Sequence, residues 1–393
     1  MSTSLILFIS AAGVIQAILL AGLLYFHPRS DRSVNIFLSL HILTVSIFML
    51  MPVFQYLFSW QSIIHLIPFQ FLIGPFLYLY VRSFRGPIHW QKQWIHFLLF
   101  AAVMIVMYVF YYPWIKKFPG LKEPSEEILL APLTLIIVIL RNLQMLFYYL
   151  LARQALSRYQ RSIQHLYSET SRINLSWVRW LLNGFLFLII TVFVLVYFIT
   201  THPENFGLFI LINTAIITPY IYLVAFKGMG QPTLWQLQPG KTKEKIEHEI
   251  IEAEMVETNQ EQVKQGISIK GLPETKATEF ITAITRLMEQ EKIYQEPELT
   301  LQMLAEKMGI PAYQASQVIN EGMNKSFYDL INGYRVEEAK RLLLDDKNKN
   351  YTILSVGFEA GFNSKTTFHT VFKKFTGLTP TEYRERNKSL VDS

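Results

Sequence analysis

Residues 351–386 read YTILSVGFEAGFNSKTTFHTVFKKFTGLTPTEYRER, and this stretch decides the fold of the C-terminal part of the chain. The pattern predicts a short helix, a tight turn at Ala360 and Gly361, and a second helix. Glycine suits the turn because it has no side chain to hinder the reversal of the backbone. Asn363 or Ser364 can cap the second helix by accepting a backbone N–H.

The second helix of this stretch has two chemically different faces. Its apolar face, at helical spacing, consists of Phe368, Val371, Phe372 and Phe375. Its polar face consists of Lys365, Thr366, His369, Thr370 and Lys373. Gly377 is placed to end the helix, and Pro380 is placed to open the next one. A short helix, a turn and a second helix with an exposed basic face are typical of a helix-turn-helix that binds DNA.

A similar pattern occurs earlier in the chain, which predicts a second helix-turn-helix. A helix is predicted from about residue 275 to 290, and Thr300 is a good N-cap for the next one. The sequence Gly309-Ile310-Pro311 predicts a turn, and Pro311 starts a further helix. A long helix at 326–344 then connects the two halves. The C-terminal part is therefore predicted to be all-α, with two helix-turn-helix units.

Base-edge recognition needs side chains that can donate and accept hydrogen bonds. Gln317 and Asn320 suit adenine, and Lys365 suits guanine or a phosphate. Lys373, Lys374 and Arg386 suit phosphates, which position a protein on DNA without specifying sequence. The complete set of candidate DNA-binding residues is Tyr313, Gln314, Ser316, Gln317, Asn320, Ser364, Lys365, Thr366, His369, Thr370, Lys373, Lys374 and Arg386.

Residues 334–386 carry a long ordered signature, YRVEEAKRLL followed by GFNSKTTFHTVFKKFTGLTPTEYR. It resembles the AraC-type (AraC/XylS) helix-turn-helix transcription regulators, and the resemblance covers roughly residues 280–386. It implies sequence-specific binding to double-stranded DNA, with base-reading helices at 311–320 and 364–372. The chain departs from the family at Gln317 and Asn320, where similar proteins often carry Arg or Lys, and at Asn324, where many have Gly.

The first 226 residues have a different composition. Hydrophobic residues make up 51% of the whole chain, and the formal net charge is +6. Before Lys227 there are 14 Lys and Arg and 6 Asp and Glu, whereas from Phe280 onward there are 15 of each. The net charge therefore belongs to the N-terminal part. The chain has no cysteine, which excludes disulfides, cysteine zinc sites and thiol catalysis.

Seven apolar runs in this part reach the roughly 20 residues that a helix needs to cross a bilayer. They lie near 4–26, 34–58, 63–81, 94–112, 128–151, 177–200 and 206–226. The first lacks a basic flank and is followed by further spans, so we interpret it as a retained helix rather than a signal peptide. The predicted fold is an all-α, seven-helix transmembrane bundle followed by the cytoplasmic AraC-type domain.

The distribution of basic residues predicts the orientation of these spans. In a seven-span arrangement, the segments 27–33, 82–93 and 152–176 and Lys227 share one side, and they hold most of the unmatched Lys and Arg. That side is therefore cytoplasmic. The protein is predicted to be a multi-pass protein of the inner (cytoplasmic) membrane, with its N-terminus outside and its DNA-binding domain in the cytoplasm.

A charged residue in the middle of a membrane span is costly and is often functional. Arg141 lies near the middle of the fifth predicted span, and none of the seven spans contains Asp or Glu. Its role is either structural or part of a signal-sensing pocket. The candidate sensing residues are Arg141, Asn142, Gln144, His41 and His65. No metal-binding or catalytic pattern is present, so we expect no enzyme, metal or cofactor.

The sequence predicts three regions: a membrane sensor at 1–226, a charged connector at 227–274 and the DNA-binding domain at 275–393. Within the connector, a weak apolar stripe that starts at Ile246 indicates either a solvated linker or a short dimerising helix. The predicted function is a membrane-bound one-component transcription regulator that responds to a small-molecule or protein signal. A homodimer is a candidate assembly of this regulator. The alternatives are a receptor or transporter whose tail binds protein, and a precursor cleaved to release a soluble regulator.

Overall fold

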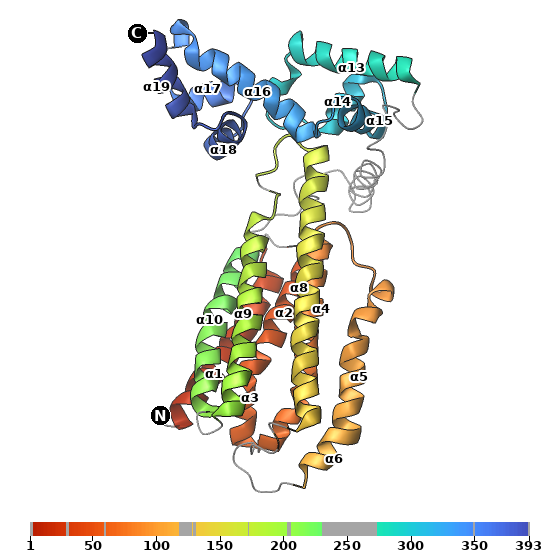
Figure 1. The fold of residues 1–393 in the computed structure, drawn as a ribbon, viewed down its shortest axis with the longest axis vertical. Helices are drawn as coiled ribbons and strands as arrows, with labels where there is room; N and C mark the ends of the chain where they lie inside the picture. The colour runs from red at the N-terminus through yellow and green to blue at the C-terminus, as the bar shows by residue number, and fades with distance from the viewer. Residues whose placement is uncertain are drawn as a thin grey trace. The chain divides into compact units, whose positions relative to one another are not determined.

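The computed structural model describes residues 3–391, apart from 29–30, 59, 118–127, 129–130, 172, 203–205, 230–272 and 349. The chain divides into two units (Figure 1). The first unit is Met1–Ser157 with Leu175–Ile246, and the second is Arg158–Asn174 with Glu247–Ser393. The connector stripe predicted from Ile246 onward lies outside the described residues. The described residues are helical and form no strand, so the all-α prediction is confirmed for them.

The first unit is a bundle of apolar helices (Figure 1). Its α-helices are α1 (Thr3–Phe26), α2 (Arg32–Val45), α3 (Ile47–Leu57), α4 (Ile73–Ser83), α5 (Leu98–Val106), α6 (Tyr112–Ile115), α8 (Pro132–Leu166, which continues into the second unit), α9 (Ser176–Thr201) and α10 (Phe206–Met229). The shorter elements are η1 (Trp60–His65), η2 (Pro68–Leu72), η3 (Trp90–Lys92), η4 (Trp94–Phe97) and η5 (Met107–Tyr111).

Six helical stretches of the described chain are long and apolar enough to cross a membrane. They are Ser4–Phe26, Gln61–Ser83, Trp94–Ile115, Pro132–Leu166, Ser176–Thr201 and Leu208–Met229. The count reaches seven if Arg32–Val45 and Ile47–Leu57, which are bent by 42° at their break, form one span. These stretches overlap the seven predicted runs. The number seven and insertion into a membrane stay predictions.

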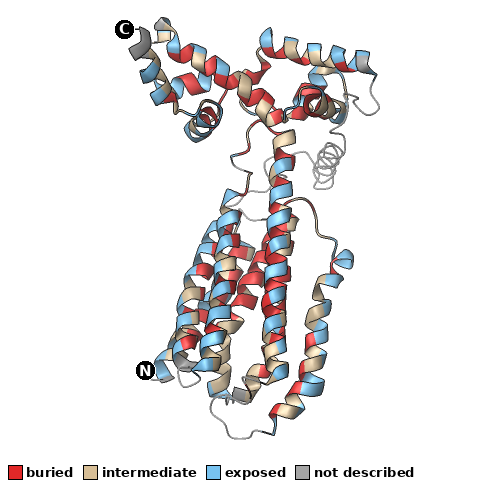
Figure 2. Ribbon diagram, in the orientation of Figure 1, coloured by how far each residue is buried: buried red, intermediate tan, exposed pale blue. Residues whose placement is uncertain are grey.

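These helices carry exposed apolar side chains. Figure 2 colours the exposed residues pale blue along the ribbon. They include Phe8, Leu23, Ile105, Phe187, Phe193 and Leu223. A soluble protein rarely exposes so much contiguous apolar surface, so this pattern suits a lipid environment. Inside the bundle, Gly74 lets α4 approach α8 closely, because a Cβ added there would lie 2.9 Å from the Tyr148 side chain.

The second unit contains the two predicted helix-turn-helix units. Its elements are α13 (Glu274–Glu289), η7 (Ile293–Gln295), α14 (Leu301–Met308), α15 (Ala312–Gln317), η8 (Val318–Gly322), α16 (Phe327–Leu344), η9 (Asp346–Asn348), α17 (Ile353–Glu359), α18 (Lys365–Thr376) and α19 (Pro380–Val391). The helix predicted at 311–320 is α15 continued by a π-turn, η8.

The helix ends follow the predicted capping chemistry. Thr300 caps α14 by accepting from Met303 N–H. At the second helix-turn-helix the cap is Ser364 rather than Asn363, and it accepts from Thr367 N–H. Gly309, Gly377 and Asn324 all have positive φ, so Asn324 has the backbone conformation that favours glycine.

The long helix α16 joins two separate hydrophobic cores. Phe327, Leu330 and Ile331, from its first half, pack in the core of the first helix-turn-helix. Val336 and Ala339, from its second half, pack in the core of the other one. One helix therefore fixes the spacing of the two helix-turn-helix units.

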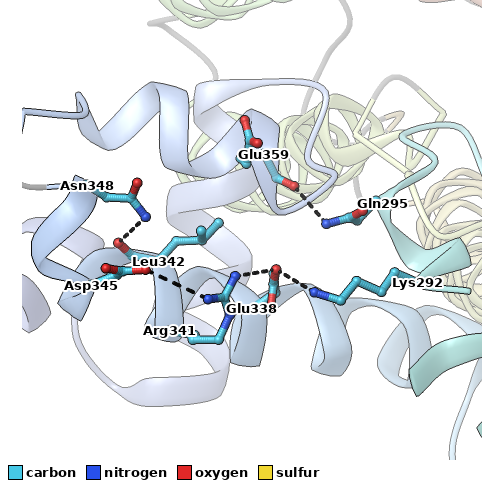
Figure 3. A network of polar contacts seen from close by, with 8 residues as sticks. All are labelled: Lys292, Gln295, Glu338, Arg341, Leu342, Asp345, Asn348 and Glu359. Carbon is cyan, nitrogen blue, oxygen red and sulfur yellow. Dashed lines mark hydrogen bonds and ion pairs between the residues drawn. The ribbon is translucent and has the colours of Figure 1, made fainter. Parts of the chain in front are cut away.

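A close backbone approach and a polar network also hold the two halves together. Gly361 has φ +96°, and a Cβ there would lie 2.6 Å from the Tyr294 carbonyl oxygen, so no other residue fits without a shift. Figure 3 shows the network. In it, the Lys292 Nζ lies 3.1 Å from a Glu338 carboxylate oxygen, and Arg341 lies 2.9 Å from the same oxygen. Lys292 precedes η7, whereas Glu338 belongs to α16.

Candidate functional site

The helix α18 presents a polar face that suits the major groove of DNA. Its inner side chains Phe368, Val371 and Phe372 are buried. Its exposed side chains are Lys365, Thr366, Thr370 and Lys373. Phe375, which we expected on the buried face, is 39% exposed. That expectation was wrong because the helix reaches its C-terminal end beside Gly377, beyond the core that the preceding residues fill.

The other candidates of this half have mixed environments. Ser364 is the N-cap, so its hydroxyl is already used within the helix. The His369 ring is half-buried, and its Nε2 has no hydrogen-bond partner. The Lys374 Nζ donates to Asp329 at 2.8 Å and lies 5.2 Å from the Tyr328 ring centroid. Arg386 is exposed. Lys365, Thr366 and Thr370 thus form the most accessible reading surface of the unit.

The first reading helix, α15, is less accessible. Tyr313 is 50% exposed, whereas Gln314 and Gln317 are half-buried. Ser316 and Asn320 are buried, at 5% and 4% exposure. The Asn320 Nδ2 donates to the Ser316 Oγ at 3.1 Å, and the His165 Nδ1 donates to the Asn320 Oδ1 at 3.0 Å. Both polar atoms of the Asn320 side-chain amide are therefore engaged within the protein.

Residues 304–386, from α14 to α19, match the family model described as "Helix-turn-helix domain". The melibiose operon regulatory protein of Escherichia coli (strain K12) is 31% identical over 87 residues, which are 22% of this chain and 28% of that protein. An uncharacterized HTH-type transcriptional regulator of Staphylococcus aureus (strain COL) is 26% identical over 110 residues, 28% of this chain and 14% of that protein.

The C-terminal unit carries a helix-turn-helix domain of the AraC type. The chain spans less than a third of the length of either relative. The similarity therefore concerns the AraC-type domain and not the first unit. The comparison with solved structures gave no significant match. Both relatives are named as regulators rather than as enzymes, in agreement with the expectation that the chain is not an enzyme.

Arg335 is a central residue of the AraC-type domain that sequence reasoning missed. Its side chain is 0% exposed. It donates from Nε to the Tyr294 carbonyl at 2.7 Å, and from Nη2 to the Glu296 carbonyl at 2.6 Å and to the Ser168 Oγ at 3.3 Å. Burial lowers the pKa of Arg335 to about 10, a value that leaves it charged at neutral pH. Arg335 lies four residues from both Ile331 and Ala339 on α16, and this helical spacing was the sequence signal that its side chain shares their buried face.

No hydrogen bond joins any two of the five predicted sensing residues, although His41, Arg141 and Gln144 all bond to residues between Gln70 and Ile73. His41 is buried and bridges the Ile73 carbonyl at 3.0 Å and the Tyr220 hydroxyl at 2.8 Å. The His65 ring pairs with the Tyr108 hydroxyl at 2.7 Å. Asn142 donates to the Val138 carbonyl within α8, at 2.9 Å. His41 and His65 thus bond to groups of the bundle, whereas the buried Asn142 Oδ1 has no hydrogen-bond partner.

Arg141 and Gln144 face the broken third stretch of the bundle. The Arg141 Nη1 donates to the Gln70 Oε1 at 2.6 Å, and the Gln144 Nε2 donates to the Phe71 carbonyl at 2.8 Å. Both side chains are 7% exposed, and the Arg141 Nε has no hydrogen-bond partner. Of the five predicted sensing residues, only Arg141 is among those that line a cavity of about 250 Å³ in this unit. No group of three or more His, Asp and Glu side chains that could hold a metal occurs among the described residues.

Proposed function

We propose that the protein is a membrane-embedded transcription regulator that binds sequence-specific sites on double-stranded DNA. The observation that carries the proposal is the AraC-type domain itself, with two helix-turn-helix units on one connecting helix. Two reading helices fixed by one linker suit two successive major-groove segments of one DNA duplex. The basic face of α18 supplies the phosphate and base contacts of the second segment.

The membrane part of the proposal rests on the apolar first unit. Its helices are long enough to span a bilayer, and their outer faces expose apolar side chains. The basic segments 27–33, 82–93 and 152–176 place that side of the bundle in the cytoplasm, with the N-terminus outside. The same orientation delivers the AraC-type domain to the compartment that contains DNA.

A signal at or within the bilayer then acts on the DNA-binding domain. The first unit offers a cavity with a buried arginine, and a small-molecule or protein signal that binds there can alter helix packing. A ligand shifts such an equilibrium only by its difference in affinity for the two states. In this mechanism the signal changes either the affinity for DNA or the formation of a homodimer.

Chromatin immunoprecipitation of the full-length protein, with cross-linking in the cells that contain it, tests the proposal. Enrichment of a small number of promoter-proximal sites is the expected result. An absence of enriched DNA, together with recovery of specific protein partners, favours a receptor or transporter whose tail binds protein. A C-terminal fragment of roughly 15–20 kDa on a blot indicates instead that the regulator is released by cleavage at the connector.

Salt dependence of DNA binding identifies the phosphate contacts. Full-length protein in lipid nanodiscs should bind an enriched duplex with an affinity that falls steeply as salt is added. In a plot of the logarithm of the binding constant against the logarithm of the salt concentration, each phosphate contact contributes about −0.9 to the slope. Lys373→Ala should reduce the steepness by about 1, because one phosphate contact is lost. Gln317→Ala, on the neutral helix, is the matched control and should leave the slope unchanged while it weakens discrimination between sequences. A slope that is flat in the wild type contradicts DNA binding through the backbone.

A further inference from the structure

The cavity in the first unit combines an apolar lining with one buried charge. Its walls include Ile64, Ile67, Met107, Val192 and Ile199, and Arg141 also lines it. The five apolar side chains come from η1, η5, α9 and the segment that precedes η2. A cavity of about 250 Å³ with such a lining suits the apolar part of a small ligand.

Arg141 has no counterion among the described residues. Its side chain is only 7% exposed, and it forms no ion pair with a described carboxylate. Gln70 is neutral, so the one short hydrogen bond to it does not balance the charge. A buried charge without a partner is costly, and its Nε remains free to donate. The Arg141 Nε can therefore donate to one further oxygen acceptor.

We infer that this cavity binds an amphipathic monoanion, with a carboxylate on Arg141 and an aliphatic tail among the apolar walls. The inference rests on the proposed function, because it names the chemical class of the signal. Arginine is suited to this task, since its planar guanidinium can donate two parallel hydrogen bonds to one carboxylate. Asn213 also lines the cavity and offers an amide to the same head group.

Binding of radiolabelled decanoate to full-length protein in nanodiscs tests the inference without DNA. Saturable binding above protein-free nanodiscs is expected, and decanol, which has the same tail without charge, should compete at least tenfold more weakly. Acetate, which lacks the tail, should not compete. Arg141→Met should weaken decanoate binding at least tenfold, whereas Arg141→Lys, which keeps the charge, should weaken it less.

Ile199→Trp fills the cavity from α9 and leaves Arg141 intact, so it separates loss of space from loss of charge. It should abolish saturable binding without changing the elution of the protein in size-exclusion chromatography. Equal competition by decanol and decanoate, or no saturable decanoate binding to the wild type, overturns the inference. Since no DNA is present, failure here leaves the proposed DNA binding to its own test.

A second inference rests on a different set of contacts, within the second unit. The segment Arg158–Asn174 comprises the end of α8 and the turn before α9, and it belongs to the same unit as the AraC-type domain. Tyr167 and Thr300 form an antiparallel β-bridge. Ser168 donates from Oγ to the Leu299 carbonyl at 2.6 Å, and its own carbonyl accepts from the Asn332 Nδ2 at 2.9 Å. Ser168 is 0% exposed, so the segment is seated in the domain rather than lying on it.

The same segment contacts both reading helices. His165 donates to Asn320, the amide that we predict to recognise adenine, at 3.0 Å. On α18, the Thr367 Oγ1 donates to a Glu169 carboxylate oxygen at 3.3 Å, one turn from the N-terminal cap. A helix N-terminus favours a negative group, and on DNA that group is a phosphate. The segment therefore occupies the Asn320 amide oxygen at one reading helix and places a carboxylate beside the first turn of the other.

The geometry points to Arg158–Asn174 as an autoinhibitory docking segment of this chain. In the docked state Asn320 cannot form the bidentate contact with a base, because both of its amide atoms are engaged within the protein. Release of the segment frees the Asn320 Oδ1, the atom that His165 engages, and removes the carboxylate from α18. This inference rests on the proposed function, since it describes how DNA binding is withheld.

The absence of cysteine from the chain permits a direct test. Directly opposed residues of an antiparallel bridge have Cα atoms about 4.5–5.5 Å apart, which is within the range that a disulfide spans. In full-length Tyr167→Cys/Thr300→Cys protein in nanodiscs, mild oxidation should form an intramolecular disulfide, detected as loss of both thiols to a maleimide label. A duplex selected from a random pool by the reduced wild type is the DNA probe.

The oxidised form should bind this probe at least tenfold more weakly than the reduced form, and a reductant should restore binding. Each single-cysteine variant is the control and should be insensitive to oxidation. His165→Leu/Glu169→Gln should bind more tightly than the wild type, by at least threefold, whereas Ser171→Ala, at an exposed position of the same segment, should not differ.

Three outcomes overturn autoinhibition: no disulfide forms, oxidation leaves affinity unchanged, or oxidation tightens it. If no form binds any DNA, the proposed function fails together with this inference. Disulfide formation remains a separate readout of the docking contact in that case.

Discussion

Among the residues that the structure describes, two arginines are buried, one in each unit, and their surroundings differ. Arg335 in the second unit donates to the carbonyls of Tyr294 and Glu296 and to the Ser168 hydroxyl. Arg141 in the first unit donates to one side chain, that of Gln70, and its Nε has no partner. Both residues are more than nine-tenths buried.

The difference separates two uses of a buried charge. A guanidinium with many fixed acceptors organises the backbone around it, because each carbonyl it satisfies would otherwise be buried without a partner. A guanidinium with spare donors beside a cavity keeps capacity for a ligand. Arg335 is therefore expected to matter for folding, and Arg141 for binding. Substitutions at the two arginines and their partners test that contrast.

Arg335→Ala should have the largest effect on stability. It leaves the buried Tyr294 carbonyl and the partly buried Glu296 carbonyl without the guanidinium donor, and it opens space beside Phe362, whose ring lies 5.9 Å from the guanidinium. A loss of about 3–5 kcal/mol in the free energy of unfolding of the second unit is expected. Urea unfolding followed by limited proteolysis of full-length protein measures it.

Arg341→Ala is the matched control for that variant, because Arg341 lies on the same helix with 56% of its side chain exposed. It should cost far less, roughly 1 kcal/mol or below. Equal losses for Arg335→Ala and Arg341→Ala would contradict a special role for the buried arginine.

Glu338 extends the contrast to a buried acid, and Figure 3 shows its partners. Its side chain is 9% exposed and accepts from Arg341 and Lys292, which lower its pKa in the folded state. A carboxylate with a lowered folded pKa stabilises the protein above its unfolded pKa, which is about 4.3 for Glu. That stabilisation is lost as the pH falls through the folded pKa.

Glu338→Gln should therefore cost about 1–2 kcal/mol at pH 7, with the partly exposed partners keeping the loss modest. The difference from wild type should shrink as the pH falls below about 4, because the wild-type carboxyl is then protonated. Urea unfolding at pH 7 and at pH 3 measures both values. Glu337→Gln, at a 70% exposed position, is the control, and a pH-independent loss for Glu338→Gln would exclude the charge as its cause.

The sequence predicted those features that local chemistry determines. Thr300 and Ser364 have side chains that cap helices in any context, and Gly377 ends α18 as its missing Cβ allows. The reading face of α18 followed from the spacing of Phe368 and Val371, because a helix with one apolar face leaves the opposite face exposed.

Features that depend on partners distant in sequence could not be predicted. The helical position of Arg335 indicates the buried face, but the carbonyls that accept its hydrogen bonds lie about 40 residues earlier and cannot be inferred from that position. Asn320 is polar and follows α15, but His165, which contacts it, lies 155 residues before it. Periodicity within one helix contains no information about such a contact, which tertiary structure alone creates.

Removing Arg141 together with its partner should have the smallest effect on stability. Arg141→Met alone leaves the buried Gln70 Oε1 without a donor and should cost about 1–3 kcal/mol. Gln70→Leu/Arg141→Met removes both polar groups, and replacing a buried polar pair with apolar residues is often close to neutral. The double variant should therefore unfold within about 1 kcal/mol of wild type, measured by thermal unfolding in nanodiscs without added ligand.

The comparison of the single and the double variant decides what Arg141 is for. Recovery of stability in the double variant means that the fold does not need the charge, so the charge is available for an anion in the cavity. A double variant that loses as much stability as Arg335→Ala means that Arg141 is structural, like Arg335, and the contrast between the two arginines disappears. Decanoate binding, measured on the same double variant, should be lost even where stability is kept, because an apolar cavity without a cation retains space for the tail and no partner for the carboxylate.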